Sequence, residues 1–498
     1  MNNPQLRGIH FALARVTVEF DTAFHLGSGH GDLLEDALFT VDANGLPALP
    51  GDAIAGVLRH AWARGDDPHD RDSRCARIFG YQKNDEGETS RLEVSWGQVH
   101  NSKDMPVPFR AEDRELSGDP VLGALFAGMV RDHVRLDGTG TAAPAGKFDQ
   151  TVVLAGTRFT FELRLDLGEG ETSVEDMHEL IALLDSRAVR LGRGGGRGLG
   201  VFRVRRAAMR VFDLRLAEDR DSYGQLPREI ARGDGGQLYA LQTREGDTPL
   251  HALLTLTPDA TWRFGGTVRS GREPRDKRPA RGGASEGEYA ELDTFALTEP
   301  RIRWNEHGHG YVEPREKAPF LVPGSALRGA LRHRAVFHAN VLNERFLPTD
   351  KGWATETETD CPDAHHDPPA EVKALFGAGR GQEQGGPGAV ATADAWVESA
   401  EQQMQQHVSL DRFTQGAMDG LLFSEAAVFG GALTLRLDVR RPASCCSTTR
   451  KVLARTLDDL CAGRLPLGAA GTRGHGRFTG SITWSDGGQW IQGQEVES

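Results

Sequence analysis

Six glycines fall between Gly192 and Gly200, within the stretch LGRGGGRGLGVFRVRR that runs from Leu191 to Arg206. Glycine lets the backbone take positive φ angles and approach another surface without a Cβ in the way. Arg190, Arg193 and Arg197 add planar guanidinium groups, whose donors match phosphate oxygens. The residue types therefore indicate a phosphate-binding loop, although a solvated loop at a helix end would have a similar composition.

A second stretch repeats this pattern 276 residues downstream, as LGAAGTRGHGRF from Leu467 to Phe478. Arg197 is matched by Arg473, and the glycines that match are Gly198 with Gly474 and Gly200 with Gly476. A glycine-rich loop by itself is a weak signal. Its recurrence with an arginine at the same place indicates that the chain carries two copies of one site.

Two further segments repeat around these loops. LPALPGDAIAGVLRHAWA, residues 46–63, is matched at an offset of 273 by FLVPGSALRGALRHRA, residues 320–335. Each predicts a helix after Pro-Gly, with Asp52 and Ser325 as N-caps. HVRLDG from His133 is matched at an offset of 274 by HVSLDR from His407, and each predicts a strand, a Gly/Ala/Pro-rich excursion and a longer alternating strand.

Three pairs at nearly constant offset predict a tandem duplication of an α+β unit. Each half reads strand, helix, several strands, helix, glycine loop, strand, which suits a ferredoxin-like (RRM-like) fold with helices on one sheet face. The second helix of the first half is expected over 173–190, with Ser173 and Asp176 as a capping pair. The boundaries that we predict are a first domain at 1–215, a linker at 216–245, a second domain at 246–485 with an insertion at about 340–395, and a tail at 486–498.

The bulk composition limits the class of protein. A chain of 498 residues is too long for one ordinary core, and its net charge of −13 argues against nucleic-acid binding over the whole surface. Basic residues are nevertheless concentrated at 187–210 and 263–281. Five scattered cysteines do not form a disulfide framework, and neither a signal segment nor an apolar run long enough to span a bilayer is seen. We therefore expect a cytoplasmic protein without a membrane partner.

The combination of these motifs resembles the RAMP superfamily. The motifs are PG[S/D]xLxGxLR at a helix start, HVxLDRxTxGAxxGxLF, and GxxRGxGRF before a strand. The similarity extends to backbone subunits of type III CRISPR complexes, and two fused units are similar to a type III-D tandem subunit. The resemblance implies a subunit that stacks along guide CRISPR RNA with other effector subunits, inserts a thumb hairpin into the guide–target duplex, and in several members cuts target RNA.

The resemblance also implies a catalytic aspartate in the loop before the first helix, acting with Mg²⁺ or Mn²⁺. Asp36, fourteen residues before Pro50, is the catalytic and metal-binding candidate of the first half. Asp293 is its best counterpart, but thirty residues separate it from Pro323. An aspartate in a loop can also merely cap a turn.

For the RNA groove we nominate arginines near the helix starts together with both glycine loops, which would cradle phosphates. The RNA-binding candidates are Arg59, Arg190, Arg193, Gly194, Gly195, Gly196, Arg197, Gly198, Ser325, Arg328, Arg332, Arg412, Gly471, Thr472, Arg473, Gly474 and His475. The thumb candidates are Leu136 and Phe148 in the first half and Leu410 and Phe423 in the second. Intramolecular ion pairs for Arg59 and Arg332, and a core position for both phenylalanines, are the alternatives.

The sequence is compatible with three functions. The first is a guide-RNA-binding subunit that cleaves target RNA, and the second is an inactive structural RNA-binding subunit. The third, which the doubled thumb motif disfavours, is a guide-precursor endoribonuclease with a metal-independent histidine site. A structural zinc is not expected at Cys361, because no CxxC accompanies it.

Overall fold

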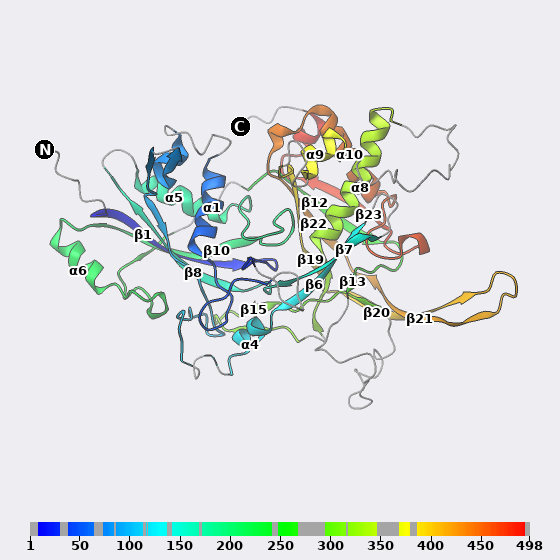
Figure 1. Ribbon diagram of the computed structural model, residues 1–498, viewed down its shortest axis with the longest axis horizontal. Helices are drawn as coiled ribbons and strands as arrows, with labels where there is room; N and C mark the ends of the chain where they lie inside the picture. The colour runs from blue at the N-terminus through cyan, green and yellow to red at the C-terminus, as the bar shows by residue number, and fades with distance from the viewer. Residues whose placement is uncertain are drawn as a thin grey trace.

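The structure is a computed structural model. It describes residues 8–29, 38–63, 73–83, 86–112, 116, 118–136, 142–168, 172–241, 248–266, 294–314, 317–345, 368–378 and 386–493. We call the residues up to 241 the first half and those from 248 onward the second half. Each half has its own sheet and its own hydrophobic core (Figure 1).

The sheet of the first half is antiparallel, and α1 (Gly51–Trp62) and α5 (Val174–Asp185) lie together on one of its faces (Figure 1). Its strands are β11 (Tyr239–Leu241), β10 (Phe202–Asp213), β1 (His10–Phe20), β8 (Arg158–Asp166) and β4 (Leu92–Val94), in that order, with β5 (Gln98–Val99) also paired to β8. The predicted capping box is confirmed, because Ser173 and Asp176 bond each other's backbone N–H groups at the start of α5.

The sheet of the second half has the same order of connections. Its strands are β23 (Phe478–Trp484), β12 (His251–Pro258), β22 (Leu433–Val439), β18 (Val390–Ala393) and β9 (Arg197–Gly198). Helices α8 (Gly324–Leu342) and α10 (Ser447–Cys461) pack against each other and take the places of α1 and α5. Without β9 and β11, both sheets follow β-α-β-β-α-β with strand order 4-1-3-2, which is the predicted α+β arrangement.

A two-stranded hairpin leaves each half. The hairpin of the first half is β6 (Met129–Leu136) with β7 (Ala142–Val152), and that of the second is β20 (Ala400–Leu410) with β21 (Ala417–Gly430). The first lies across the middle of the molecule, whereas the second projects away from it (Figure 1).

Smaller elements complete the described chain. The strand pairs are β2 (Tyr81–Lys83) with β3 (Glu86–Glu88), β13 (Gly265–Gly266) with β14 (Phe295–Ala296), β15 (Ile302–Trp304) with β16 (Gly310–Val312), and β17 (Phe320–Val322) with β19 (Ala395–Val397). The helices are α2 (Arg74–Phe79), α4 (Pro120–Ala127), α6 (Ala217–Gln225), α9 (Ala370–Phe376) and α11 (Gln489–Gln492), and 3-10 turns lie at Ile230–Arg232, Pro442–Ser444 and Gly471–Arg473.

Two helix starts differ from the prediction. The N-caps are Pro50 and Pro323, and no side chain caps either helix. The predicted caps Asp52 and Ser325 therefore lie inside the first turn, one residue beyond the glycine that begins each helix. Glycine is needed there because a Cβ on Gly51 would lie 2.2 Å from the carbonyl oxygen of Val94.

Two segments that we predicted as connections contain regular structure. Within the predicted linker 216–245, α6 and the 3-10 turn lead to β11, which extends the first sheet beyond residue 215. Within the predicted insertion 340–395, α8 continues to Leu342, and β18 is a strand of the second sheet. Residues 346–367 and 379–385 of this insertion lie outside the described residues.

The hairpin β15–β16 belongs to the second half in sequence but packs on the first. Ile302 is buried in the first hydrophobic core, and the Trp304 indole N–H donates to the Gly156 carbonyl at 2.8 Å. The Arg158 guanidinium lies 4.0 Å from the centre of the Trp304 ring. We call β15–β16 the brace, because it fixes the second half against the first.

Candidate nucleic-acid interface

The two glycine loops share a pattern of backbone angles, although Gly471–Arg473 forms a 3-10 turn and Arg197–Gly198 forms strand β9. Positive φ angles occur at four matching positions. Three of them are glycine in both loops, namely Gly192 with Gly468, Gly198 with Gly474, and Gly200 with Gly476. At the remaining position Gly194 is matched by Ala470. A Cβ on Gly200 or on Gly476 would lie 2.0 Å from a carbonyl oxygen of its own loop. The sequence match of the loops is therefore a match of backbone geometry.

The first loop is held between the two halves. Its strand β9 pairs in parallel with β18, so that Arg197 is opposite Thr392. A Cβ on Gly198 would lie 2.9 Å from Cα of Gly324 at the start of α8. The loop, with Gly194 to Gly198, thus lies against the helix start that carries Ser325, Arg328 and Arg332.

Arginines from both halves gather around this loop. The Arg328 guanidinium carbon lies 3.7 Å from the place that a Cβ on Gly196 would take, and Arg440 donates to the Gly195 carbonyl at 2.8 Å. Arg193, Arg197 and Arg332 are exposed.

Four of these arginines, Arg197, Arg328, Arg332 and Arg440, have lowered pKa values, and the shifts are largest at Arg328 and Arg440. Burial, together with the charges of Arg197, Arg332 and Arg190, lowers the pKa of Arg328 to about 10. Burial and Arg190 lower the pKa of Arg440 to about 9, although Asp438 acts in the opposite direction. A group whose charge is disfavoured by like charges gains from an incoming anion, so this cluster suits a phosphate backbone.

Arg190 has a different position from the one that we predicted. Its side chain is buried, and its guanidinium forms a 2.6 Å ion pair with Asp438 and donates to the Thr392 carbonyl at 2.5 Å. Arg190 therefore joins the two halves instead of facing the surface. Arg440 was missed by sequence reasoning, because nothing in the local sequence shows that it lies beside a loop 245 residues away.

The second loop surrounds a buried carboxylate. Glu425 is 1% exposed and pairs with Arg263 at 3.0 Å, Arg473 at 2.9 Å and His407 at 2.7 Å. His475 is buried beside it at 3.7 Å. Burial opposes ionisation, but Arg263 and Arg473 hold the pKa of Glu425 below its usual value. The second loop is thus partly neutralised, in contrast to the first.

The two hairpins repeat an aromatic pair at their bases. His133 stacks on Phe148 with ring centres 4.9 Å apart, and His407 stacks on Phe423 at 5.0 Å. Both phenylalanines are partly buried, and the Arg473 guanidinium lies 5.5 Å from the centre of the Phe423 ring. The hairpin bases therefore lie beside the glycine loops.

The tip of the second hairpin is exposed and includes a large apolar side chain. Phe413 is 83% exposed, and Leu410 and the predicted RNA contact Arg412 are also exposed. Residues 137–141 of the first hairpin lie outside the described residues, and the side chain of Leu136 is not described.

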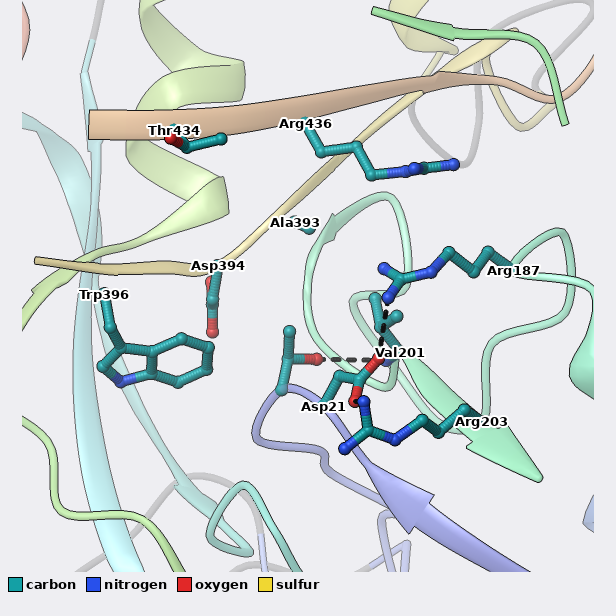
Figure 2. A pocket seen from close by; sticks show the side chains of 10 residues that line it. Asp21, Arg187, Val201, Arg203, Ala393, Asp394, Trp396, Thr434 and Arg436 are labelled. Atoms are coloured by element: carbon teal, nitrogen blue, oxygen red, sulfur yellow. Dashed lines mark hydrogen bonds and ion pairs between the residues drawn. The ribbon is translucent and has the colours of Figure 1, made fainter. Parts of the chain in front are cut away.

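A polar cleft of about 200 Å³ lies where the halves meet (Figure 2). Asp21 is held there between Arg187 at 3.1 Å and Arg203 at 3.4 Å, while Asp394 and Arg436 line the opposite wall. Burial raises the pKa of Asp21. The predicted contact Arg59 does not join this cleft; it lines another one with Phe79 and Tyr81.

The catalytic candidates Asp36 and Asp293 both lie outside the described residues, and the described chain resumes at Leu38 after the first and at Thr294 after the second. Thr40 N donates to the Leu26 carbonyl at 2.7 Å, and Leu297 N donates to the Phe264 carbonyl at 2.8 Å. Each of these anchors follows its aspartate by four residues.

The same register continues beyond the anchors. Ala48 N donates to the Thr40 carbonyl and Leu321 N to the Leu297 carbonyl. The additional residues of the second half therefore lie between Leu297 and Leu321, where they form the brace. Counted back from Thr40 and Leu297, Asp36 and Asp293 stand at the same distance in the sequence.

The described residues contain neither a cluster of metal ligands nor a helix that could span a membrane. No group of three or more histidine, cysteine, aspartate or glutamate side chains converges there as a metal site. None of the described helices is long and apolar enough to cross a membrane.

Comparison with known proteins gives one family. The profile of the RAMP superfamily matches residues 17–203 and 319–479, which is more than half of the chain. No curated protein matches the sequence. The matched segments include both glycine loops and both helix starts.

Proposed function

The chain belongs to the RAMP superfamily, and from that premise we propose that it is a tandem RNA-binding subunit of a type III CRISPR complex. RAMP membership implies a CRISPR-associated RNA-binding role, and RAMP proteins generally bind CRISPR RNA within larger complexes. Our proposal adds that the two halves are duplicated units, each of which holds one segment of guide RNA.

The arginine cluster around the first glycine loop carries this proposal. Arg193, Arg197 and Arg332 are exposed around a loop with close backbone approach, and Arg328 and Arg440 have lowered pKa values beside it. Guide phosphates would supply the negative charge that the cluster needs. The helix start of α8 adds its dipole to this attraction.

We further propose that Asp36 and Asp293 cleave target RNA at the two units. The support is their equal spacing from the matching backbone anchors at Thr40 and Leu297. A carboxylate is the ligand type that Mg²⁺ or Mn²⁺ prefers, and such a cation would polarise the scissile phosphate. The arginine cluster would hold the guide strand while the hairpins β6–β7 and β20–β21 contact the duplex.

RNA that copurifies with the chain from its native host tests the binding proposal. We expect a guide-sized RNA with a repeat-derived tag, identified by sequencing and mass spectrometry. Heterogeneous cellular RNA, or none, would contradict the assignment to a guide-bound complex.

The cleavage proposal is tested in that native complex with labelled complementary RNA. Asp36→Asn should abolish one cut and Asp293→Asn the other, with guide binding unchanged. Unchanged cuts in both variants would reject these aspartates and leave the structural-subunit alternative. Processing of guide precursor that survives EDTA would favour the third alternative.

A further inference from the structure

The contact between the two halves uses two different surfaces. The first half contributes its glycine loop and β6, and the second contributes the start of α8, the β18–β19 turn and the brace. A contact between unlike surfaces can in principle be repeated by further copies and produce an open filament. Each half also has a surface equivalent to the one that its partner half uses in this contact, and we call these two unused surfaces the free ends. Their residues show whether the contact can be repeated between copies.

Buried charges lie at the centre of the contact. Arg131 on β6 is 6% exposed and pairs with Glu299 at 2.6 Å and with Asp394 at 2.7 Å. The Asp394 carboxylate also accepts from Gly324 N at 2.8 Å. A third ion pair joins Arg190 to Asp438 at 2.6 Å. We call these residues, together with the brace, the joint.

The strand register identifies the counterpart of Arg131 at the free end of the second half. Arg131 is opposite Gln150 on β7, two residues before the stacked His133. Gln405 is opposite Glu425 on β21, two residues before the stacked His407. The counterpart of Arg131 is therefore an uncharged glutamine.

The counterpart of Asp394 at the free end of the first half follows in the same way. Ala395 pairs with Val322, just before Pro323, and Gly97 pairs with Leu49, just before Pro50. The residue before Gly97 is Trp96, which is 45% exposed. An indole thus takes the place of the carboxylate that receives Arg131.

The ion pair of Arg190 with Asp438 also has no equivalent at the free ends. Leu191 and Leu467 make the same hydrogen bond across their loops, so Pro466 matches Arg190. The strand pairing of β8 and β22 matches Arg164 to Asp438, because Leu163 and Leu437 have equivalent partners on β1 and β12. Pro466 and Arg164, which occupy these positions at the free ends, cannot form an ion pair with each other.

The brace and the acceptor Glu299 also lack a usable equivalent at the free end of the first half. Only eight residues lead from Thr40 to Ala48, so the first half has no brace. Asp42 matches Glu299, but its Oδ1 accepts from the N–H groups of Asn44 and Leu46 in its own turn.

We propose that the joint is made once in each chain and that copies do not associate end to end. The ion pairs of Arg131 and Arg190 fix the order of first half followed by second half, and the brace adds to the contact. Because the free ends lack these ion pairs and the brace, a second copy cannot form there the interactions that join the two halves within one chain. This inference does not depend on RNA binding.

Installing the missing charges tests the proposal. The variant Trp96→Asp, Arg164→Asp, Gln405→Arg, Pro466→Arg recreates between copies the equivalents of the Arg131–Asp394 and Arg190–Asp438 pairs. We expect wild type to have the mass of one 54.1 kDa chain by analytical ultracentrifugation, with and without RNA. The variant should reach at least twice that mass at the same concentration.

A matched control separates ion pairing from added charge. The variant Trp96→Arg, Gln405→Arg, Pro466→Arg retains Arg164. It places positive charges opposite each other at positions 96 and 405 and at positions 164 and 466, so it should remain a single chain. Circular dichroism shows whether both variants are folded. A folded four-residue variant that remains a single chain would overturn the proposal.

Crosslinking of wild type decides the question even if the variants do not fold. Crosslinks between the Trp96 face of one copy and the Gln405 face of another would overturn the proposal. Crosslinks confined to one chain, or to other faces, would support it, because the ends would then remain unpaired.

Discussion

Arg197 and Arg473 occupy matching positions in the two glycine loops but differ in charge balance. Arg473 pairs with the buried Glu425, whereas Arg197 has no acidic partner among the described residues. Burial and Arg193 lower the pKa of Arg197. A phosphate at the first loop therefore meets more uncompensated charge than one at the second.

We predict that Arg197→Ala weakens binding of single-stranded guide RNA more than Arg473→Ala does. A charged hydrogen bond contributes about 1.5–3 kcal/mol, so the loss at Arg197 should be about tenfold or more. The slope of log affinity against log salt should fall by about 0.7 for one lost phosphate contact. Fluorescence anisotropy at several salt concentrations measures both quantities. Arg215→Ala, at an exposed arginine paired with Asp213, is the control, and equal losses at positions 197 and 473 would contradict the charge argument.

His133 gives a prediction about pH. Burial, followed by the charges of Arg131 and Arg197, lowers the pKa of His133 to about 4 from its ordinary 6.5. Between these values the unfolded chain binds the proton more readily, so the free energy of unfolding should fall as pH drops from 6.5 towards 4. His133→Gln should remove part of this slope in denaturant titrations between pH 4 and 7. An unchanged slope would show that His133 is protonated equally in both states.

At the scale of elements, the glycine loops depend on backbone clearance. A Cβ on Gly192 would lie 2.4 Å from the His25 carbonyl oxygen, whereas no atom lies within 4 Å of a Cβ on Gly474. Both residues have positive φ angles, at 92° and 89°. Gly192→Ala should therefore destabilise by more than the roughly 1 kcal/mol of conformational strain expected for Gly474→Ala. Thermal unfolding measures the difference, and equal melting temperatures would contradict it.

Much of the architecture could be predicted from repeated local patterns. The loop pair and both helices of each half occur as predicted, because glycine spacing and apolar periodicity are local properties. The hairpins also occur, but their return strands β7 and β21 cover much of the segments that we predicted as Gly/Ala/Pro-rich excursions. The helix caps were wrong, since Pro50 and Pro323 already set the extended backbone that precedes each helix. The strand β18 was hidden within a predicted insertion, because only pairing with β22 identifies it.

Long-range charge pairing limited what could be predicted of the candidate site. Arg190 was expected to face RNA, but Asp438, 248 residues away, holds it in the interior. Arg440 and Glu425 were missed for the same reason, since their partners come from other elements. The sequence contains these residues, but only the fold determines which arginines remain available to a phosphate.

At the scale of the whole molecule, stability of the contact between halves should depend on Arg131. Arg131→Gln introduces the residue type found at the matching position, Gln405. It leaves Glu299 and Asp394 buried without their cation. Removing one partner of a buried ion pair costs roughly 3–5 kcal/mol. The variant should therefore show faster hydrogen exchange at β6, β18 and the brace, with the two separate sheet cores protected as in wild type. Gln405→Ala, at the partly buried matching position, is the control and should leave exchange at all three elements unchanged. Equal protection of β6 and β18 in Arg131→Gln and wild type would mean that the ion pairs do not hold the halves together, and the brace alone would then have to account for their contact.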